Sequence, residues 1–178
     1  MIRIGIIGPS EKNIKLNQKQ RIENIAEKIG ELLAQKRAVI LTGGMDGIME
    51  YVAKGAKKFN GLTIGTPGNK KNSSNQYIDI EILSDVDVGS FIFSALPNCD
   101  AIITLPGGAG TLAELCIAYR RKLPIVIIKG LDLYYDSLVN NYLDNSKCVL
   151  IRGASSPENA VELVLKLAKE NLINQKKI

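Results

Sequence analysis

Short apolar runs alternate with amphipathic segments along most of this chain, and the alternation limits the folds that it can adopt. Apolar runs of roughly four to eight residues are typical of buried strands. Strands are predicted at 2–8, 38–42, 62–67, 77–82, 100–105, 124–130 and 147–151. Apolar residues recur at helical spacing from about Asn17 to Lys36, which predicts a long helix there. A last helix is predicted to begin at Pro157 with Ser156 as its N-cap, because both residue types favour those positions.

Strands that alternate with helices form parallel sheets with helices on both faces. The crossovers between such strands are right-handed. With 178 residues, the chain is long enough for one domain of this kind and short for two. The sequence therefore predicts a single α/β domain over residues 1–178, with a doubly wound, mostly parallel sheet.

The composition argues against several classes of protein. No apolar run approaches the roughly 20 residues of a spanning helix, and the first predicted strand begins at Ile2, so neither a membrane segment nor a signal peptide is expected. We expect a cytoplasmic protein. Cys99, Cys116 and Cys148 lack the paired spacing of a disulfide framework or zinc site, and Cys99 and Cys116 are predicted in the core. Histidine is absent, which excludes histidine triads and histidine metal sites. Asp79 and Glu81 share one strand face and could hold a hard cation, but an exposed strand face is favoured, so no metal site is predicted.

The net charge of +5 suggests an anionic partner. Basic and acidic residues interleave between Glu11 and Arg37, as on a solvent-facing helix. Tryptophan is absent and the other aromatic residues do not alternate with Lys or Arg, so no stacking surface for nucleic acid is apparent. The charge therefore favours a small anionic ligand over nucleic acid.

Three glycine-rich turns directly follow predicted strands: "GPS" (8–10), "TGGMDG" (42–47) and "PGGAGT" (106–111). The carboxyl ends of parallel strands share one edge of the sheet, where ligands bind in such folds. A helix start exposes unpaired amides, and glycine lets an anion approach them closely. We therefore predict a phosphate-binding edge, with plain tight turns as the alternative. The candidate residues are Gly8, Ser10, Gly43, Gly44, Gly47, Gly107, Gly108, Gly110 and Thr111.

The kind of phosphate site is narrowed by what the turns contain. A GxxxxGK[ST] loop is absent, which disfavours an ordinary P-loop NTPase. The stretch "GAGTLA" (108–113) matches a relaxed G-x-G-x-x-A pattern, with Asp132 just after the next predicted strand. Dinucleotide binding is therefore one alternative.

"PGGAGTLAE" (106–114) resembles the PGGxGTxxE signature of the LOG-type proteins, formerly called lysine decarboxylase-like. "GGMDGIM" resembles their GGxxGLM motif, and the strand order, the "TPGN" turn and "KLPIVII" extend the resemblance over nearly the whole chain. The likeness is greatest to the Rossmann-like subgroup that includes molybdenum cofactor carrier proteins. It implies a homo-oligomer, a dimer or tetramer, with no required cofactor. The implied ligand is a nucleoside monophosphate or a molybdopterin-type cofactor, bound through its phosphate at these turns.

The resemblance also implies a role for Glu114. LOG enzymes are nucleoside 5′-monophosphate phosphoribohydrolases, which release the base and ribose 5-phosphate, and the matching carboxylate helps to expel the base. Thr111 to Glu114 also spell a capping box, with Thr111 as the N-cap, and this alternative stays open. The arginine-lysine pair of the enzymes is replaced here by Phe91 and Ile92. Binding is therefore favoured over hydrolysis, unless Lys70 or Lys71 supplies the missing cation.

Two further expectations concern packing. Tyr134 and Tyr135 are predicted to pack a helix against the sheet. The apolar segment "VGSFIFSAL" (88–96) is predicted as a short helix whose Phe91 or Phe93 faces a partner subunit. A two-fold dimer is the default for such an association.

Overall fold

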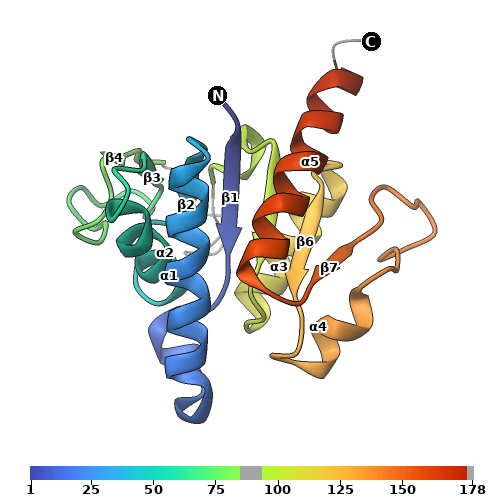
Figure 1. The fold of residues 1–178 in the computed structure, drawn as a ribbon, viewed down its shortest axis with the longest axis horizontal. Helices are drawn as coiled ribbons and strands as arrows, with labels where there is room; N and C mark the ends of the chain where they lie inside the picture. Colours follow the sequence, from blue (N-terminus) through green and yellow to red (C-terminus); the bar gives the residue numbers. More distant parts are fainter. Residues whose placement is uncertain (85–93, 176–178) are drawn as a thin grey trace.

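The centre of the molecule is a parallel β-sheet whose strand order reverses beside its first strand (Figure 1). The structure, a computed structural model, describes residues 1–84 and 94–175. Within these residues the sheet order is β4-β3-β2-β1-β5-β6-β7, and every neighbouring pair is parallel. The strands are β1 (Arg3–Ile7), β2 (Val39–Thr42), β3 (Thr63–Gly65), β4 (Ile80–Glu81), β5 (Ala101–Thr104), β6 (Ile125–Ile128) and β7 (Arg152–Ala154). The predicted Rossmann-like α/β sheet is confirmed.

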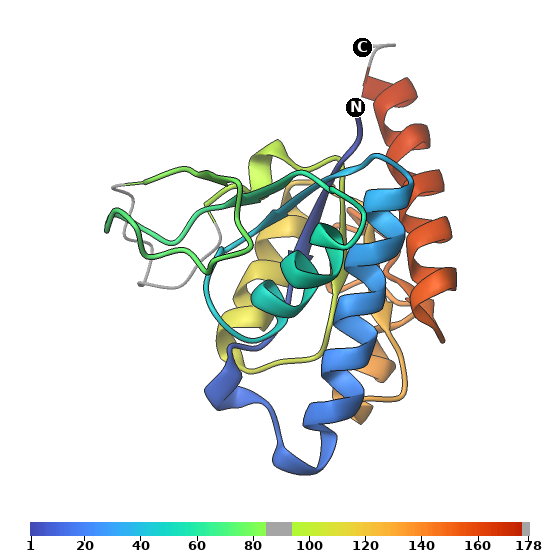
Figure 2. The ribbon, with the colours of Figure 1, turned by 60° about the vertical axis from the view of Figure 1, so that its left-hand side comes forward.

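Helices cover both faces of this sheet (Figures 1 and 2). One face carries α1 (Lys19–Gln35), α2 (Ile48–Lys57) and α5 (Pro157–Gln175). The other face carries α3 (Ala109–Arg120) and α4 (Leu133–Leu138). Short 3-10 helices η1 (Glu11–Asn13) and η2 (Leu16–Gln18) connect β1 to α1, and η3 (Leu96–Asn98) precedes β5.

The strands are apolar along their whole length because both faces are buried. Ile4 and Ile6 pack with α1, α2 and α5, whereas Ile7 points to the opposite face and packs with α3. Successive side chains of a strand point to opposite faces, so two separate core clusters result. Continuous burial explains why the sequence shows apolar runs instead of alternation.

Most predicted elements are found within a few residues of their expected positions. The helix predicted from Asn17 to Lys36 is α1, and α5 begins at Pro157 as expected. The Ser156 hydroxyl accepts a hydrogen bond from the Asn159 amide at 3.2 Å, which confirms Ser156 as the cap.

The strand predicted at 147–151 is wrong. The strand that pairs with β6 is Arg152–Ala154. Ile151 is fully buried, but its backbone bonds to the preceding loop, because its amide donates to Asn141 and its carbonyl accepts from Asn140. The apolar run therefore reflects burial of Ile151 rather than a strand.

Two packing expectations are only half correct. Tyr135 is buried, but Tyr134 is 54% exposed, because the two side chains point to different sides of the short helix α4. Cys99 is buried, but Cys116 is exposed on α3. α3 is apolar on most of its surface, so its sequence does not reveal which side faces solvent. Phe91, Phe93 and most of the segment 88–96 lie outside the described residues.

No helix in residues 1–84 and 94–175 combines the length and the apolar character that crossing a membrane requires.

Candidate ligand-binding site at the carboxyl edge of the sheet

The three glycine-rich turns meet at one edge of the sheet, beyond the carboxyl ends of β1, β2 and β5. A Cβ built on Gly47 would lie 2.6 Å from the Pro9 carbonyl oxygen, so the second turn touches the first. A Cβ built on Gly107 would lie 3.1 Å from the Pro9 ring, so the third turn touches the first as well. The chain reverses its direction across the sheet between β1 and β5, which is where ligands bind in open α/β sheets.

A cavity of about 640 Å³ lies at this edge and runs across the ends of four strands. Its size is in the range of small-molecule sites. The segment after β5 contributes Gly108, Ala109, Gly110, Thr111 and Glu114 to its lining, and the end of β1 with the segment that follows contributes residues 6–10, Lys12 and Asn13. The segment after β2 contributes Gly43, Met45, Asp46 and Met49. The segment after β3 contributes residues 66–69, and Ser84 and Ser94 complete the lining. Of the predicted candidates, Gly44, Gly47 and Gly107 do not line it.

The glycines of the second turn are explained by packing between loops. Gly44 and Gly47 have positive φ angles of 78° and 67°, a conformation that favours glycine. The Gly44 amide donates to the Thr42 hydroxyl at 2.9 Å, and the first amide of α2, on Ile48, donates to the Pro9 carbonyl. The amides at the start of α2 are thus partly used within the protein. A phosphate role for Gly44 and Gly47 stays a prediction.

The first turn is fastened to the second by side chains as well. The Asp46 carboxylate accepts a hydrogen bond from the Glu11 amide at 3.0 Å. Ser10 lines the cavity, and its hydroxyl accepts from the Asn13 side chain at 3.0 Å. Gly8 also lines the cavity, but the side chain of Ile48 packs against its Cα. The first turn therefore forms a rigid wall beside the third.

The third turn differs from the second because its glycines face open space. α3 begins at Ala109 with Gly108 as its N-cap, and no atom of residues 1–84 or 94–175 lies within 4 Å of a Cβ built on Gly108 or Gly110. In the described part of the chain, no hydrogen bond takes up the backbone amides of Ala109, Gly110 and Thr111. The first amides of an α-helix have no partner within the helix, and they attract anions. The start of α3 is therefore an exposed donor group on the cavity wall.

The capping-box interpretation of Thr111 and Glu114 is wrong. Thr111 lies in the first turn of α3, after the actual N-cap Gly108, and makes no capping hydrogen bond. Its hydroxyl lies only 2.3 Å from the position of a Cβ on Gly107, so Gly107 must be glycine for Thr111 to pack there. Glu114 is one turn further along α3, is 8% exposed and lines the cavity. The helix thus presents this carboxylate to the cavity instead of to its own N-terminus.

Tyr135 lies behind the third turn. Burial raises the pKa of its hydroxyl to about 12, and the nearby Asp132 and Glu114 carboxylates add to the rise. Tyr135 thereby remains a neutral phenol beside the turn at physiological pH.

Several lining residues are not apparent from the sequence patterns. Lys12 places a cation in the lining from η1, whereas Lys70 and Lys71, proposed as substitutes for the missing pair, are exposed and do not line the cavity. Thr66 and Met45 also line it; they lie in the "TPGN" turn and the "GGMDGIM" motif, but neither pattern predicts a site role for them. Only the order β3-β2-β1-β5 places these residues beside the third turn.

Asp132, the acidic residue of the dinucleotide-binding alternative, has a structural role in α4. The Asp132 carboxylate caps α4 by accepting hydrogen bonds from the amides of Tyr134 and Tyr135 at 3.0 and 3.3 Å. Asp132 is absent from the cavity lining. Among the described residues there is also no group of Cys, Asp or Glu side chains that could hold a metal ion.

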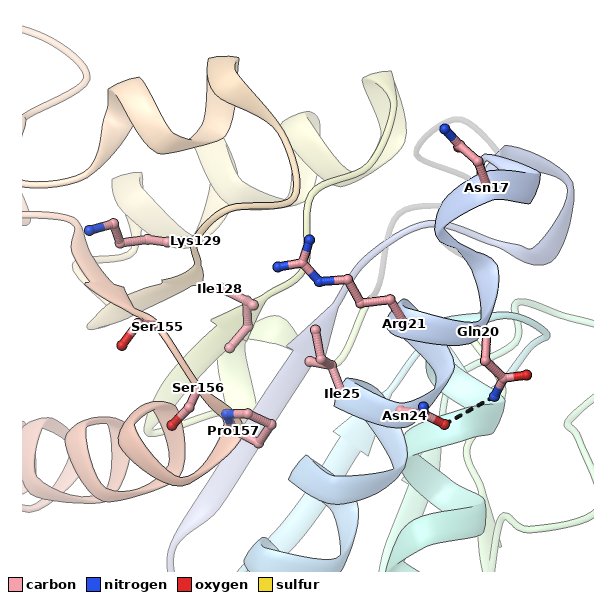
Figure 3. A pocket seen from close by; sticks show the side chains of 10 residues that line it. All are labelled: Asn17, Gln20, Arg21, Asn24, Ile25, Ile128, Lys129, Ser155, Ser156 and Pro157. Carbon is pink, nitrogen blue, oxygen red and sulfur yellow. Dashed lines mark hydrogen bonds between the residues drawn. The ribbon is translucent and has the colours of Figure 1, made fainter.

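A second cavity, of about 630 Å³, lies between the starts of α1 and α5 (Figure 3). Ile25 and Ile128 form its floor, and Arg21, Lys129 and Ser156 stand around it. Figure 3 shows the Lys129 side chain extending away from Arg21, so the two charged groups do not converge. Most of its lining residues are polar, but none belongs to a glycine-rich turn.

The fold and the first cavity define a class of protein: Rossmann-like α/β proteins with a ligand-sized cavity at the carboxyl edge of a parallel sheet. Residues 1–161 match the model of the SLOG cluster4 family, and the chain belongs to this family. The resemblance to LOG-type proteins is thereby confirmed.

Three solved structures are similar over nearly their whole length. The X-ray structure of TM1055, a structural genomics target, is 26% identical with a TM-score of 0.81, over 93% of this chain and 99% of its own. The molybdenum cofactor binding protein of the phototrophic bacterium Rippkaea orientalis is 30% identical with a TM-score of 0.76, over 93% and 96%. The molybdenum cofactor carrier protein of Chlamydomonas reinhardtii is 25% identical with a TM-score of 0.77, over 94% and 98%.

Proposed function

We propose that this protein binds a nucleotide-like ligand through its phosphate at the start of α3. The observation that carries the proposal is the open wall at Gly108 and Gly110, where three backbone amides with no partner among the described residues line a cavity of about 640 Å³. Phosphate suits this place because the helix dipole and the amides both favour a negative charge. Lys12 adds a positive charge to the same lining.

The ligand proposed is a nucleoside monophosphate or a molybdopterin-type cofactor. Similarity to two proteins named for the molybdenum cofactor supports the second of these. Since the described residues contain no cluster of metal-ligating side chains, the protein would hold such a cofactor through its phosphate and its organic ring system. We propose that the protein carries the ligand and needs no further cofactor.

The phosphate site is tested with Gly108→Val. A Cβ at this position has no described atom within 4 Å, so the fold should persist, but the valine side chain would stand where the phosphate approaches. We expect the affinity for AMP and GMP, measured by calorimetry, to fall about tenfold or more, equivalent to about 1.4 kcal/mol. Guanosine, which lacks the phosphate, serves as the ligand control and should bind weakly to both proteins. Unchanged affinity for both nucleotides would remove the phosphate site at α3.

Hydrolysis is a second candidate function, because Glu114 is a largely buried carboxylate that lines the cavity. A carboxylate in this place can stabilise the positive charge that develops on a sugar as its base departs. Incubation of AMP with the purified protein should then release free adenine, and Glu114→Gln should abolish the release. Binding of AMP without release would support a carrier.

The expected self-association stays a prediction. Light scattering at micromolar concentration should report a dimer or tetramer of the 19.4 kDa chain. A monomer under these conditions would contradict it.

A further inference from the structure

The lining of the cavity changes in character from β5 to β3. Backbone amides and Glu114 stand at the β5 end, while the β3 end is formed by Thr66, Pro67, Gly68 and Asn69. β1 and β2 lie between these two strands. Neighbouring strands are about 4.8 Å apart, so the two ends are separated by roughly 14 Å. A phosphate at α3 therefore fills one end only, and a ligand that reaches the other end must be long.

Two methionines line the middle of the cavity. Met45 and Met49 are both half-buried and both come from the segment that follows β2. The Met49 sulfur lies 2.9 Å from the position of a Cβ on Gly43, so the side chain packs closely on the glycine backbone. Thioethers make favourable contacts with aromatic rings. The middle of the cavity is thus suited to a planar ring.

Thr66 supplies a polar group at the β3 end. The residue is 7% exposed, and its hydroxyl has no hydrogen-bond partner among the described residues. A buried hydroxyl without a partner is costly, and most such groups in proteins are satisfied. The Thr66 amide is already used, since it donates to the Thr42 carbonyl at 3.1 Å. The hydroxyl oxygen is covered in this conformation, so a ligand in the cavity satisfies it, as a donor or as an acceptor, once the Thr66 side chain turns toward the cavity that it lines.

We propose that the β3 end of the cavity is a subsite for a planar, hydrogen-bonding heterocycle, with Thr66 as its hydrogen-bond partner and Met45 and Met49 against the ring. This inference rests on the proposed function, because the phosphate at α3 fixes the other end of the ligand. The class of ligand is a purine or pterin ring joined to a phosphate by a linker long enough to cross β1 and β2.

The experiment compares GMP with ribose 5-phosphate, which has the phosphate end and no ring. Calorimetry should show that GMP binds the wild-type protein more tightly. Thr66→Val keeps the shape of the side chain and removes the hydroxyl; it should weaken GMP binding about five- to tenfold, as expected for loss of one buried hydrogen bond. Ribose 5-phosphate binding should stay unchanged.

Thr104→Val is the matched control. Thr104 is also buried with a hydroxyl that lacks a partner among the described residues, but it does not line the cavity. Both valine variants should melt at or above the wild-type temperature without ligand, because each removes a desolvated hydroxyl. Only Thr66→Val should change GMP affinity, so a loss there cannot come from a general change in stability.

Different results would contradict the phosphate site at α3 and the ring subsite at the β3 end. Equal affinities for GMP and ribose 5-phosphate, or a Thr66→Val protein that binds GMP like the wild type, would overturn the ring subsite and leave the phosphate site standing. GMP binding that survives Gly108→Val but not Thr66→Val would overturn the phosphate site and support the subsite. Absence of binding by GMP and ribose 5-phosphate alike would overturn both.

Discussion

Glycines of two similar strand-to-helix turns have different physical roles in this protein. Gly47 holds a positive φ of 67° and touches the backbone of the first turn, whereas Gly108 has a negative φ and open space around it. The first is required for packing two loops together, and the second leaves donors accessible. The difference between the two turns decides which of them can bind an anion.

Substitution of alanine at these two positions should separate the roles. Gly47→Ala should lower the free energy of unfolding by about 1–3 kcal/mol, because the side chain requires a strained backbone and meets the Pro9 carbonyl at 2.6 Å. Gly108→Ala should change it by less than about 0.5 kcal/mol, as for an ordinary exposed position. Urea unfolding followed by circular dichroism measures both. Equal losses would show that the space around Gly108 is filled.

Helices α1 and α2 cross at a pair of glycines. A Cβ on Gly30 would lie 2.0 Å from the Val52 carbonyl oxygen, and one on Gly55 would lie 2.0 Å from the Glu27 carbonyl oxygen. The two helix backbones therefore touch without intervening side chains. Ion pairs flank the crossing, with Lys54 bonded to Glu27 and Lys58 bonded to Glu27 and Glu31. Because α2 follows the second turn, this crossing helps to fix one wall of the cavity.

Gly30→Ala should destabilise the protein even though alanine favours helices. Forcing the two helices apart should cost about 1–3 kcal/mol, as in other overpacked interiors. Gly110→Ala is the matched control, since it places the same residue in a helix with nothing within 4 Å. It should stabilise by about 0.4–1 kcal/mol. If both variants proved equally stable in urea, the close approach of α1 and α2 would be contradicted.

The elements that the sequence predicts best are those buried on both faces or marked by capping residues. β1, β2, β5 and β6 are central strands, and their apolar runs mark them clearly. The sequence predicts β7 at the wrong residues. β7 is a short edge strand that pairs with one neighbour only, so its position in the sequence is weakly specified. The third turn and Glu114 were predicted from a motif. Thr66 and Met49 also lie in quoted motifs, but their place in the cavity could not be predicted, since they reach it only through the order of the strands.

At the scale of the whole molecule, carboxylates hold separate segments together. Glu11 bonds to Lys19 of α1 and to Tyr51 of α2, and these bonds hold the pKa of Glu11 below its ordinary value of 4.5. Glu81 of β4 accepts hydrogen bonds from the amides of Ser74, Asn72 and Ser73, at 2.9, 2.7 and 3.1 Å. These bonds likewise lower the pKa of Glu81 below 4.5. Both carboxylates fasten loops that adjoin the cavity.

These shifts predict how stability depends on pH. The unfolded chain takes up protons at Glu11 and Glu81 near pH 4.5, before the folded protein does, so their contribution is present above that pH and is lost as the pH falls below it. The chain has no histidine, so no histidine titration should alter stability between about pH 5 and 8. Urea midpoints should therefore be level in that range and fall in more acidic solution.

Glu81→Gln should have a lower midpoint than the wild type at pH 7, and the difference should shrink at about pH 3. Glu170→Gln, which removes a carboxylate with no hydrogen bond among the described residues, is the control and should follow the wild-type profile. A Glu81→Gln midpoint equal to that of the wild type at pH 7 would show that the carboxylate does not hold the loop of residues 72–74.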